Sequence, residues 1–207
     1  MTVDMGDLAL LVLAALCLVV FVCLLVEVLK GKPMRIDRLC HSLFVEKLRS
    51  PALTVVMKAV SNLASAPFIV GALVAAFVWA PCRLRVILIA INVGAVSVID
   101  QILKALVHRS RPQGFRLVGA PGLSFPSGHS MAAVAFYGYG IWLVQSGACG
   151  ISPSAVVDMA LACVILAIGA SRIYLGVHYA SDVLGGFCLA FVWLILFVRL
   201  GAWIFAV

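Results

Sequence analysis

Long apolar runs alternate with short polar stretches along the chain. The first run, Leu8–Val26, has 19 apolar residues without interruption. Further runs cover residues 53–79, 86–107, 127–144, 154–170 and 183 to the C-terminus. About 20 apolar residues in a helix cross the roughly 30 Å hydrocarbon layer. The pattern therefore predicts an all-α, polytopic membrane protein with six transmembrane helices and both termini on one side of the membrane.

Residues 30–50 are the most polar stretch of the chain. Apolar side chains recur within it at spacings of three, four, one and four, which is the spacing of one helical stripe: Ile36, Leu39, Leu43, Phe44 and Leu48. The remaining positions are mostly basic. The pattern predicts an interfacial amphipathic helix that follows the first span and lies on the membrane surface.

The composition excludes several classes of protein. Hydrophobic residues make up 65% of the 207 positions and charged residues only 11%, which excludes a soluble enzyme, a nucleic-acid binder and a disordered chain. The net charge is +7, and the basic residues are scattered between the apolar runs. This distribution indicates that they set the membrane topology and contact lipid headgroups. Seven cysteines without a C-x-x-C pair predict small apolar side chains, with neither a disulfide framework nor a zinc site. We expect one membrane-embedded domain over residues 1–207.

Three polar clusters carry the candidate chemistry. Their members are Lys104-x6-Arg111-Pro112, Pro126-Ser127-Gly128-His129 and Ser171-Arg172-x5-His178-x3-Asp182. Charged groups next to a bilayer are costly and usually functional. Six spans put the connection between spans three and four on the same membrane side as the connection between spans five and six. The clusters are therefore expected to meet on one face.

The cations in these clusters suit a phosphate group. Lys104, Arg111 and Arg172 supply positive charge and hydrogen-bond donors for phosphate oxygens. Ser127 and Gly128 begin a helix, whose free backbone N–H groups and dipole favour an anion. The pattern predicts these five residues as phosphate-binding groups.

The histidines in these clusters suit nucleophilic catalysis. His178 and Asp182 are four residues apart, so one helical turn would bring them together. A carboxylate on one imidazole nitrogen fixes the tautomer and leaves the other nitrogen free to attack. His129 can donate a proton to the departing oxygen. The residues suggest no metal ligand set, and we expect no metal and no cofactor.

Charged residues beside the clusters have more than one interpretation. Asp100 lies four residues before Lys104, which lies four before His108, so this face is either a structural ion-pair ladder or a support that holds Lys104. Arg109 and Arg116 lie outside the motifs and are expected to meet solvent or lipid headgroups.

The three clusters resemble the signature motifs of the type 2 phosphatidic acid phosphatase family, in the right order and without a substitution. The resemblance covers roughly residues 50–200. It implies a metal-independent membrane phosphatase that forms a phosphohistidine. It further implies His178 as the nucleophile, Asp182 as its partner and His129 as the general acid. The phosphate ligands that it implies are Lys104, Arg111, Ser127, Gly128 and Arg172.

The resemblance leaves the substrate open. Small bacterial members act on phosphatidylglycerol phosphate, phosphatidate or undecaprenyl diphosphate, and haloperoxidases and sugar phosphatases with similar motifs are longer. A lipid phosphotransferase that uses the same phosphohistidine, and a non-catalytic binder or transporter of phosphate headgroups, are the alternatives. The expected partners are a membrane lipid phosphate and the bilayer, with no nucleic acid and no obligate protein partner.

Two arguments about orientation disagree. Most Lys and Arg residues lie on the side of the three clusters, so the positive-inside rule points that side toward the cytoplasm. The family resemblance implies a cell-membrane protein whose site is extracytoplasmic. We adopt the extracytoplasmic side as the expectation.

Overall fold

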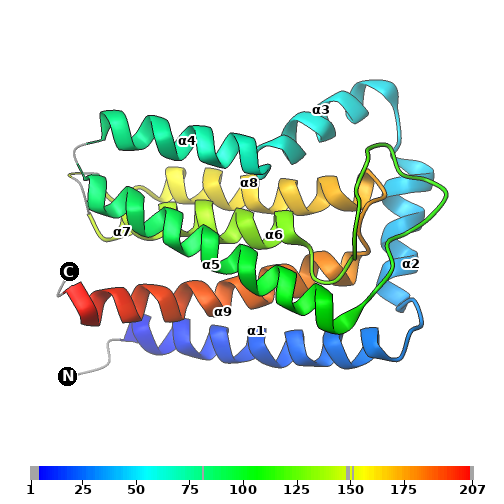
Figure 1. The fold of residues 1–207 in the computed structure, drawn as a ribbon, viewed down its shortest axis with the longest axis horizontal. Coiled ribbons are helices and arrows are strands. Elements are labelled where there is room, and N and C mark those ends of the chain that lie inside the picture. The colour runs from blue at the N-terminus through cyan, green and yellow to red at the C-terminus, as the bar shows by residue number, and fades with distance from the viewer. Residues whose placement is uncertain (1–4, 81, 148–149, 151, 206–207) are drawn as a thin grey trace.

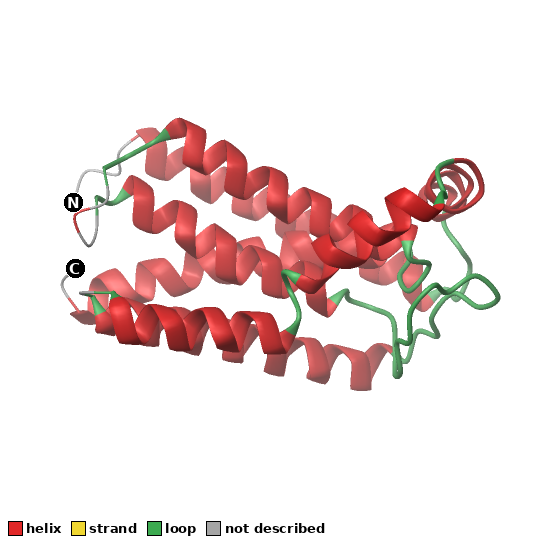
Figure 2. Ribbon diagram, turned by 90° about the horizontal axis from the view of Figure 1, so that it is seen from above, coloured by secondary structure: helices red, strands yellow, loops and turns green. Residues whose placement is uncertain are grey.

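The computed structural model describes residues 5–80, 82–147, 150 and 152–205, and this part of the chain is helical without a strand (Figure 2). The elements are α1 (Met5–Leu29), α2 (Arg35–His41), η1 (Ser42–Lys47), α3 (Pro51–Asn62), α4 (Ala66–Trp79), α5 (Arg83–Val107), α6 (Gly128–Ala133), η2 (Val134–Gly138), α7 (Tyr139–Gln145), α8 (Ala155–Tyr174) and α9 (Ala180–Phe205). The all-α prediction is confirmed for these residues.

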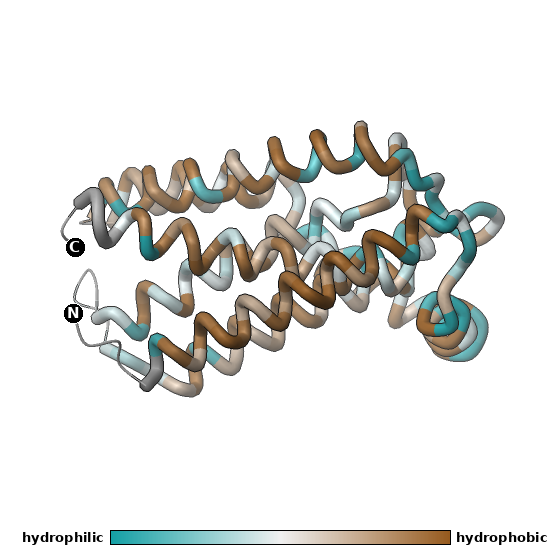
Figure 3. The backbone as a smooth tube through the Cα atoms, turned by 90° about the horizontal axis from the view of Figure 1, so that it is seen from below, coloured by the Kyte–Doolittle hydropathy of each residue, from teal (hydrophilic) through white to brown (hydrophobic). Residues whose placement is uncertain are grey.

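The helices form one bundle (Figure 1). The run of α6, η2 and α7 lies in its middle and packs against α5, α8 and α9, while α1 lies against α9. The start of α1 and the end of α9 lie at one end of the bundle. The long loop of residues 108–127 and helix α2 lie at the opposite end, where hydrophilic positions gather (Figure 3).

The described residues contain four single helices that are long and apolar enough to cross a membrane, namely Asp7–Leu29, Arg83–Val107, Ala155–Tyr174 and Ala180–Gly201. Helices α3 and α4 add a fifth candidate, but they are bent by 52° at the break between them. Ser65 caps α4, and Pro67 in the first turn lacks the N–H needed to continue α3 into α4. The stretch expected as one straight span is therefore a broken one.

The middle run differs from a regular span because η2 is π-helical. The carbonyl of Ala135 in η2 accepts a hydrogen bond from Asn92 Nδ2 at 2.8 Å. Asn92 Oδ1 accepts another from Trp193 Nε1 at 2.9 Å, so both polar ends of this fully buried amide are paired. The π-helical turn thus joins α5 and α9 through a polar contact in the apolar core.

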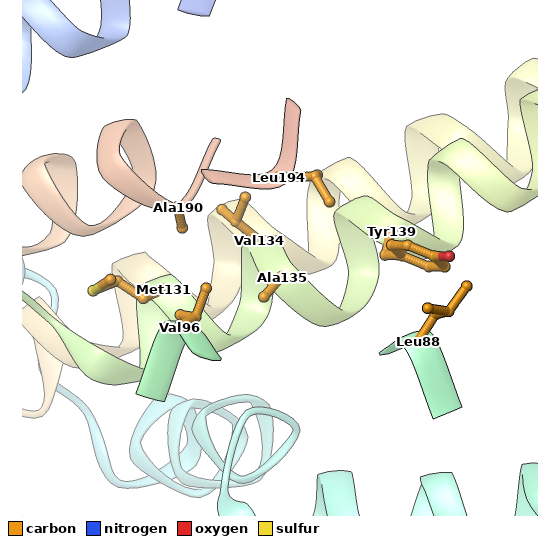
Figure 4. Packing of buried hydrophobic residues seen from close by; sticks show 8 residues of the cluster. All are labelled: Leu88, Val96, Met131, Val134, Ala135, Tyr139, Ala190 and Leu194. Atoms are coloured by element: carbon orange, nitrogen blue, oxygen red, sulfur yellow. The ribbon is translucent and has the colours of Figure 1, made fainter. Parts of the chain in front are cut away.

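The core around this run is well packed. Met131, Val134, Ala135 and Tyr139 meet side chains of α5 and α9 (Figure 4). These partners are Leu88, Val96, Ala190 and Leu194. Close packing of this kind gives van der Waals contacts along the run, so the segment that begins at Gly128 is held along its length.

The polar stretch after α1 forms the short helix α2, which runs directly into the π-helical turn η1. Ile36, Leu39 and Leu43 are exposed, whereas Phe44 packs inward against the buried cluster that contains Tyr174. Arg49 is also engaged, because its Nη2 donates to the carbonyls of Tyr174 at 2.9 Å and Phe115 at 2.7 Å.

The cysteines follow the expectation with one exception. Cys17, Cys23, Cys40, Cys163 and Cys188 are free thiols. Cys82, which precedes α5 at the end of the bundle that holds the termini, is disulfide-bonded. The expectation that the cysteines act only as small apolar side chains is wrong at this position.

Candidate active site

A cavity of about 880 Å³ brings most of the predicted site residues together. Six of the eight line it: Lys104, Arg111, Gly128, His129, Arg172 and His178. The other two, Ser127 and Asp182, are fully buried. The three sequence clusters therefore converge, as the span pattern predicts.

His178 and Asp182 form a buried pair. His178 lies in the five-residue connection before α9 and Asp182 in the first turn of that helix. His178 Nδ1 is 3.4 Å from Asp182 Oδ2, and both side chains are almost completely shielded from solvent. The backbone N–H of Tyr179 and the hydroxyl of Ser124 donate to the same carboxylate oxygen, at 2.8 and 2.5 Å. The carboxylate is thus fixed beside the imidazole.

Arg111 contacts the opposite nitrogen of the same imidazole. Its Nη1 lies 2.9 Å from His178 Nε2 and donates to the carbonyl of Val177 at 3.0 Å. A guanidinium can only donate, so Nε2 is the unprotonated nitrogen and Nδ1 carries the proton toward Asp182. Burial, and to a lesser degree Arg111 and Arg172, lower the pKa of His178 to about 4 against the opposing effect of Asp182. The imidazole is therefore neutral at physiological pH with a lone pair on Nε2.

Asp100 holds Lys104 at the cavity. Lys104 Nζ lies 2.6 Å from Asp100 Oδ2, and both side chains are largely buried. His108 ends α5 in the left-handed region with φ 52°. A Cβ at residue 128 would lie 2.8 Å from Asp100 Oδ2, so glycine is required where α6 begins beside this carboxylate. Of the two interpretations of Asp100, the geometry favours a support that holds Lys104.

Arg172 and His129 complete the cavity from two further helices. Arg172 lies in the last turn of α8, not in the connection after it, and donates to the hydroxyl of Ser61 on α3. Its buried Nε has no hydrogen-bond partner in the described part of the structure. His129 stands in the first turn of α6. The cavity thus presents three cations and two imidazoles.

Ser127 is placed differently from the other predicted phosphate ligands. Its backbone N–H donates to the carbonyl of Asp182 at 3.0 Å, and its hydroxyl accepts from Ser130 at 2.9 Å. These contacts anchor the start of α6 to the start of α9. Phosphate binding by Ser127 stays a prediction.

Two residues at the site, Arg109 and Ser124, are not predicted from the sequence. Arg109 is largely buried and ion-paired, with Nη1 2.6 Å from Asp182 Oδ1 and Nη2 2.8 Å from Asp37 Oδ2. The expectation of solvent or headgroup contact is wrong for Arg109, because its guanidinium is held between the carboxylates of Asp37 on α2 and Asp182 on α9. Ser124 belongs to no motif, and only the folded loop brings its hydroxyl to Asp182.

The donor chemistry of the site favours anions. Within the described ranges, no group of three or more His, Cys, Asp or Glu side chains is arranged to hold a metal ion. Away from the cations the cavity is apolar and runs between α4 and α5. Its walls there are Ile69, Val70 and Leu73 on one side and Ala90 and Val93 on the other. The site can therefore accept a phosphate at one end and an apolar chain at the other.

Known proteins with similar sequences and structures agree with this chemistry. The PAP2 superfamily matches residues 82–205. Phosphatidylglycerophosphatase B of Bacillus subtilis (strain 168) is 32% identical over 146 residues, which is 69% of this chain and 72% of that protein.

Solved structures share the fold. The crystal structure of a transmembrane PAP2-type phosphatidylglycerolphosphate phosphatase from Bacillus subtilis has a TM-score of 0.78 and 26% identity, and the match covers 92% of this chain and 96% of that one. The crystal structure of Aquifex aeolicus LpxE has a TM-score of 0.65 and 22% identity, and the match covers 77% of this chain and 92% of that one. At this identity the likeness supports the fold only. The chain belongs to the PAP2 superfamily and is a multi-pass membrane lipid phosphatase.

Proposed function

We propose that the protein hydrolyses a phosphomonoester or diphosphate of a membrane lipid through a phosphohistidine at His178, without a metal. The observation that carries the proposal is the arrangement around His178, where Asp182 faces Nδ1 and the unprotonated Nε2 faces the cavity cation Arg111. A neutral, oriented imidazole beside a cation is what attack on an anionic phosphorus requires.

In the first step, His178 Nε2 attacks phosphorus and the bond to the leaving oxygen breaks. Arg111 shifts its donor from Nε2 to a phosphoryl oxygen, and Lys104 and Arg172 bind the remaining oxygens. Asp182 stabilises the positive charge that develops on the imidazole. The bound phosphate offsets the positive charge of Lys104, Arg111 and Arg172, which lets His129 carry a proton. His129 donates this proton to the leaving oxygen, so a neutral alcohol or a lipid phosphate departs.

In the second step, water attacks the phosphorus of the phosphohistidine. His129, now neutral, takes a proton from this water as the phosphorus–nitrogen bond breaks. Inorganic phosphate leaves, and His178 returns to its starting tautomer. An alcohol in place of water would give the alternative phosphotransferase, so added alcohols distinguish the two activities.

Phosphatidylglycerol phosphate is the first substrate to test, because the similar Bacillus sequence and the similar Bacillus crystal structure are both named for it. Phosphatidate and undecaprenyl diphosphate are the other candidates. The apolar walls between α4 and α5 support a lipid chain lying beside the phosphate. The experiment is phosphate release by the purified protein from each lipid in micelles, with and without chelator and with an added alcohol. Release from none of the three lipids would refute the proposal.

We further propose that the whole chain is one domain with six crossings. The additional crossing would be the run of α6, η2 and α7, which begins at the cavity inside the bundle and ends with α7 at the end where α1 begins (Figure 1). Six crossings agree with the start of α1 and the end of α9 lying at the end of the bundle away from the cavity. The exposed Ile36, Leu39 and Leu43 support an interfacial position for α2 and η1, with apolar side chains in the acyl boundary.

We propose that the cavity faces the extracytoplasmic side, as the family resemblance implies. Some basic residues near the cavity make contacts within the protein: Arg49 binds the Tyr174 carbonyl and Arg109 pairs with Asp182. These structural contacts explain their presence on this side without the positive-inside rule. The disulfide at Cys82 favours the opposite orientation, because disulfides persist in oxidising compartments. A C-terminal fusion tests the assignment. Fluorescence of a fused green fluorescent protein supports it, and activity of fused alkaline phosphatase overturns it.

A further inference from the structure

A buried chain of charges links the surface helix α2 to the site. Asp37 is the buried residue of α2, with its side chain only 1% exposed. Its Oδ2 accepts from Arg109 Nη2 at 2.8 Å, and Arg109 Nη1 reaches Asp182 Oδ1 at 2.6 Å. One guanidinium therefore bridges two carboxylates that lie 145 positions apart in the sequence.

The bridge is reinforced at both ends. Asp37 Oδ1 accepts from the backbone N–H of Ser181 at 2.9 Å, and Arg109 Nη1 also donates to the Ser181 hydroxyl at 2.7 Å. The guanidinium carbon lies 4.2 Å from the centre of the Tyr179 ring. These contacts fix the segment that runs from His178 into α9.

The charge balance gives Asp37 a definite effect on Asp182. A buried charge that loses its partner is strongly unfavourable, so carboxylates and guanidinium depend on one another. While Arg109 is shared between two carboxylates, Asp182 keeps more of its negative charge for His178. Without Asp37, the whole charge of Arg109 would act on Asp182, which would then stabilise a positive imidazole less well.

We propose that Asp37 is a positioning residue for the lipid phosphatase reaction and acts on the His178–Asp182 pair through Arg109. The inference rests on the proposed role of His178. It assigns a task to a residue that lies outside the three motifs and more than 60 positions before the first of them. Helix α2 is then part of the site's support as well as a surface element.

The test compares Asp37→Asn with the matched control Glu46→Gln, which removes an exposed carboxylate from the neighbouring turn η1. The readouts are kcat and the pH profile of kcat on one lipid phosphate, after folding is checked by melting temperature and gel filtration. We expect Asp37→Asn to lower kcat roughly tenfold, which corresponds to a loss of about 1.4 kcal/mol of transition-state stabilisation, and to move the acid limb of its profile to lower pH. Glu46→Gln should keep the wild-type values.

The pH profile distinguishes positioning from a smaller folded fraction, because a smaller fraction lowers the rate equally at every pH. Arg111, His129, Arg172 and Tyr179 also face the His178–Asp182 pair and are unchanged in both variants, so their contributions cancel in the comparison. The effect of Arg109 on Asp182 is the one that Asp37→Asn is expected to change.

Arg109→Lys gives a second variant if Asp37→Asn yields no folded protein. Lysine keeps the positive charge, but its single ammonium group cannot bridge Asp37 and Asp182 as the planar guanidinium of Arg109 does. The kcat of this variant should therefore also fall. Wild-type kcat and pH profile in a folded variant would overturn the inference. Failure of the wild-type protein itself to release phosphate would instead refute the proposed function.

Discussion

Arg111 Nη1 lies 2.9 Å from His178 Nε2, the nitrogen that points away from Asp182. This contact assigns the tautomer, because a guanidinium can only donate a hydrogen bond. It also puts a phosphate-binding cation on the atom that is proposed to attack phosphorus. Binding of a phosphate would draw the Arg111 donor away from Nε2, which would free the lone pair of this nitrogen when the substrate is in place.

The roles of the two histidines can be separated by leaving group. His129→Ala removes the proposed general acid, which is typically worth 10²–10⁴-fold in rate. Nitrophenolate needs little protonation, so this variant should still release one nitrophenol per site from nitrophenyl phosphate in a burst, followed by slow turnover. No burst is expected on an alkyl phosphate. A wild-type steady rate on both substrates would contradict the assignment of His129.

Acid should destabilise the protein through His178. Its pKa is about 4 in the fold and about 6.5 when unfolded. Between these values the unfolded chain binds more protons, so the free energy of unfolding falls as the pH drops from 6.5 toward 4, by up to about 3 kcal/mol. Above pH 6.5 both states are neutral and the effect vanishes.

Melting temperatures in detergent across this range measure the acid effect, and His178→Gln serves as the control because glutamine does not titrate. We expect the wild-type protein to lose more stability than the variant between pH 6.5 and 4. Parallel curves would show that His178 does not bind its proton in this window.

Chelator should leave the activity intact. Three cations, Lys104, Arg111 and Arg172, line the cavity and can neutralise a phosphoryl group themselves. Phosphate release from a lipid phosphate is measured in EDTA and then with magnesium added back. We expect equal rates under both conditions, whereas loss in EDTA with recovery in magnesium would refute the metal-free mechanism.

The surface segment offers a test of substrate access. Arg35 and Lys47 are exposed, whereas Arg38 donates to the Pro33 carbonyl and Arg49 is bound to two carbonyls. A cation near an anionic surface contributes about 1 kcal/mol. The double variant Arg35→Gln with Lys47→Gln should therefore lose efficiency on lipid phosphates in anionic vesicles.

The same double variant should keep its rate on a short soluble phosphate ester, because the cavity residues are untouched. Equal loss on both substrates would indicate structural damage. Unchanged rates on both would mean that the segment only connects α1 and α3.

The residues that the sequence revealed are those with a fixed spacing or a long apolar run. Lys104, His129 and His178 stand in motifs. The number of predicted spans between these motifs was enough to predict that they meet on one side of the membrane. Contacts that depend on the path of the irregular loop were out of reach. Arg109 was assigned to the surface because nothing in the sequence links it to Asp37, and Ser124 belongs to no pattern.

Details of helix geometry were also out of reach from the sequence. Hydropathy does not distinguish a straight span from the bent pair of α3 and α4, although Pro67 marked the place. The π-helical turns η1 and η2 were not predicted, and neither was the inward packing of Phe44, which lies seven residues after the buried Asp37 and so shares its helix face.

Trapping the covalent intermediate tests the central claim most directly. Wild-type protein and the variants His129→Ala and His178→Ala are mixed with phosphate-labelled nitrophenyl phosphate, whose leaving group needs little protonation, then quenched in alkali and digested for mass spectrometry. The account predicts a phosphohistidine on the peptide that contains His178, at higher occupancy in His129→Ala and absent in His178→Ala. A phosphohistidine at His129, or turnover by His178→Ala at the wild-type rate, would contradict it.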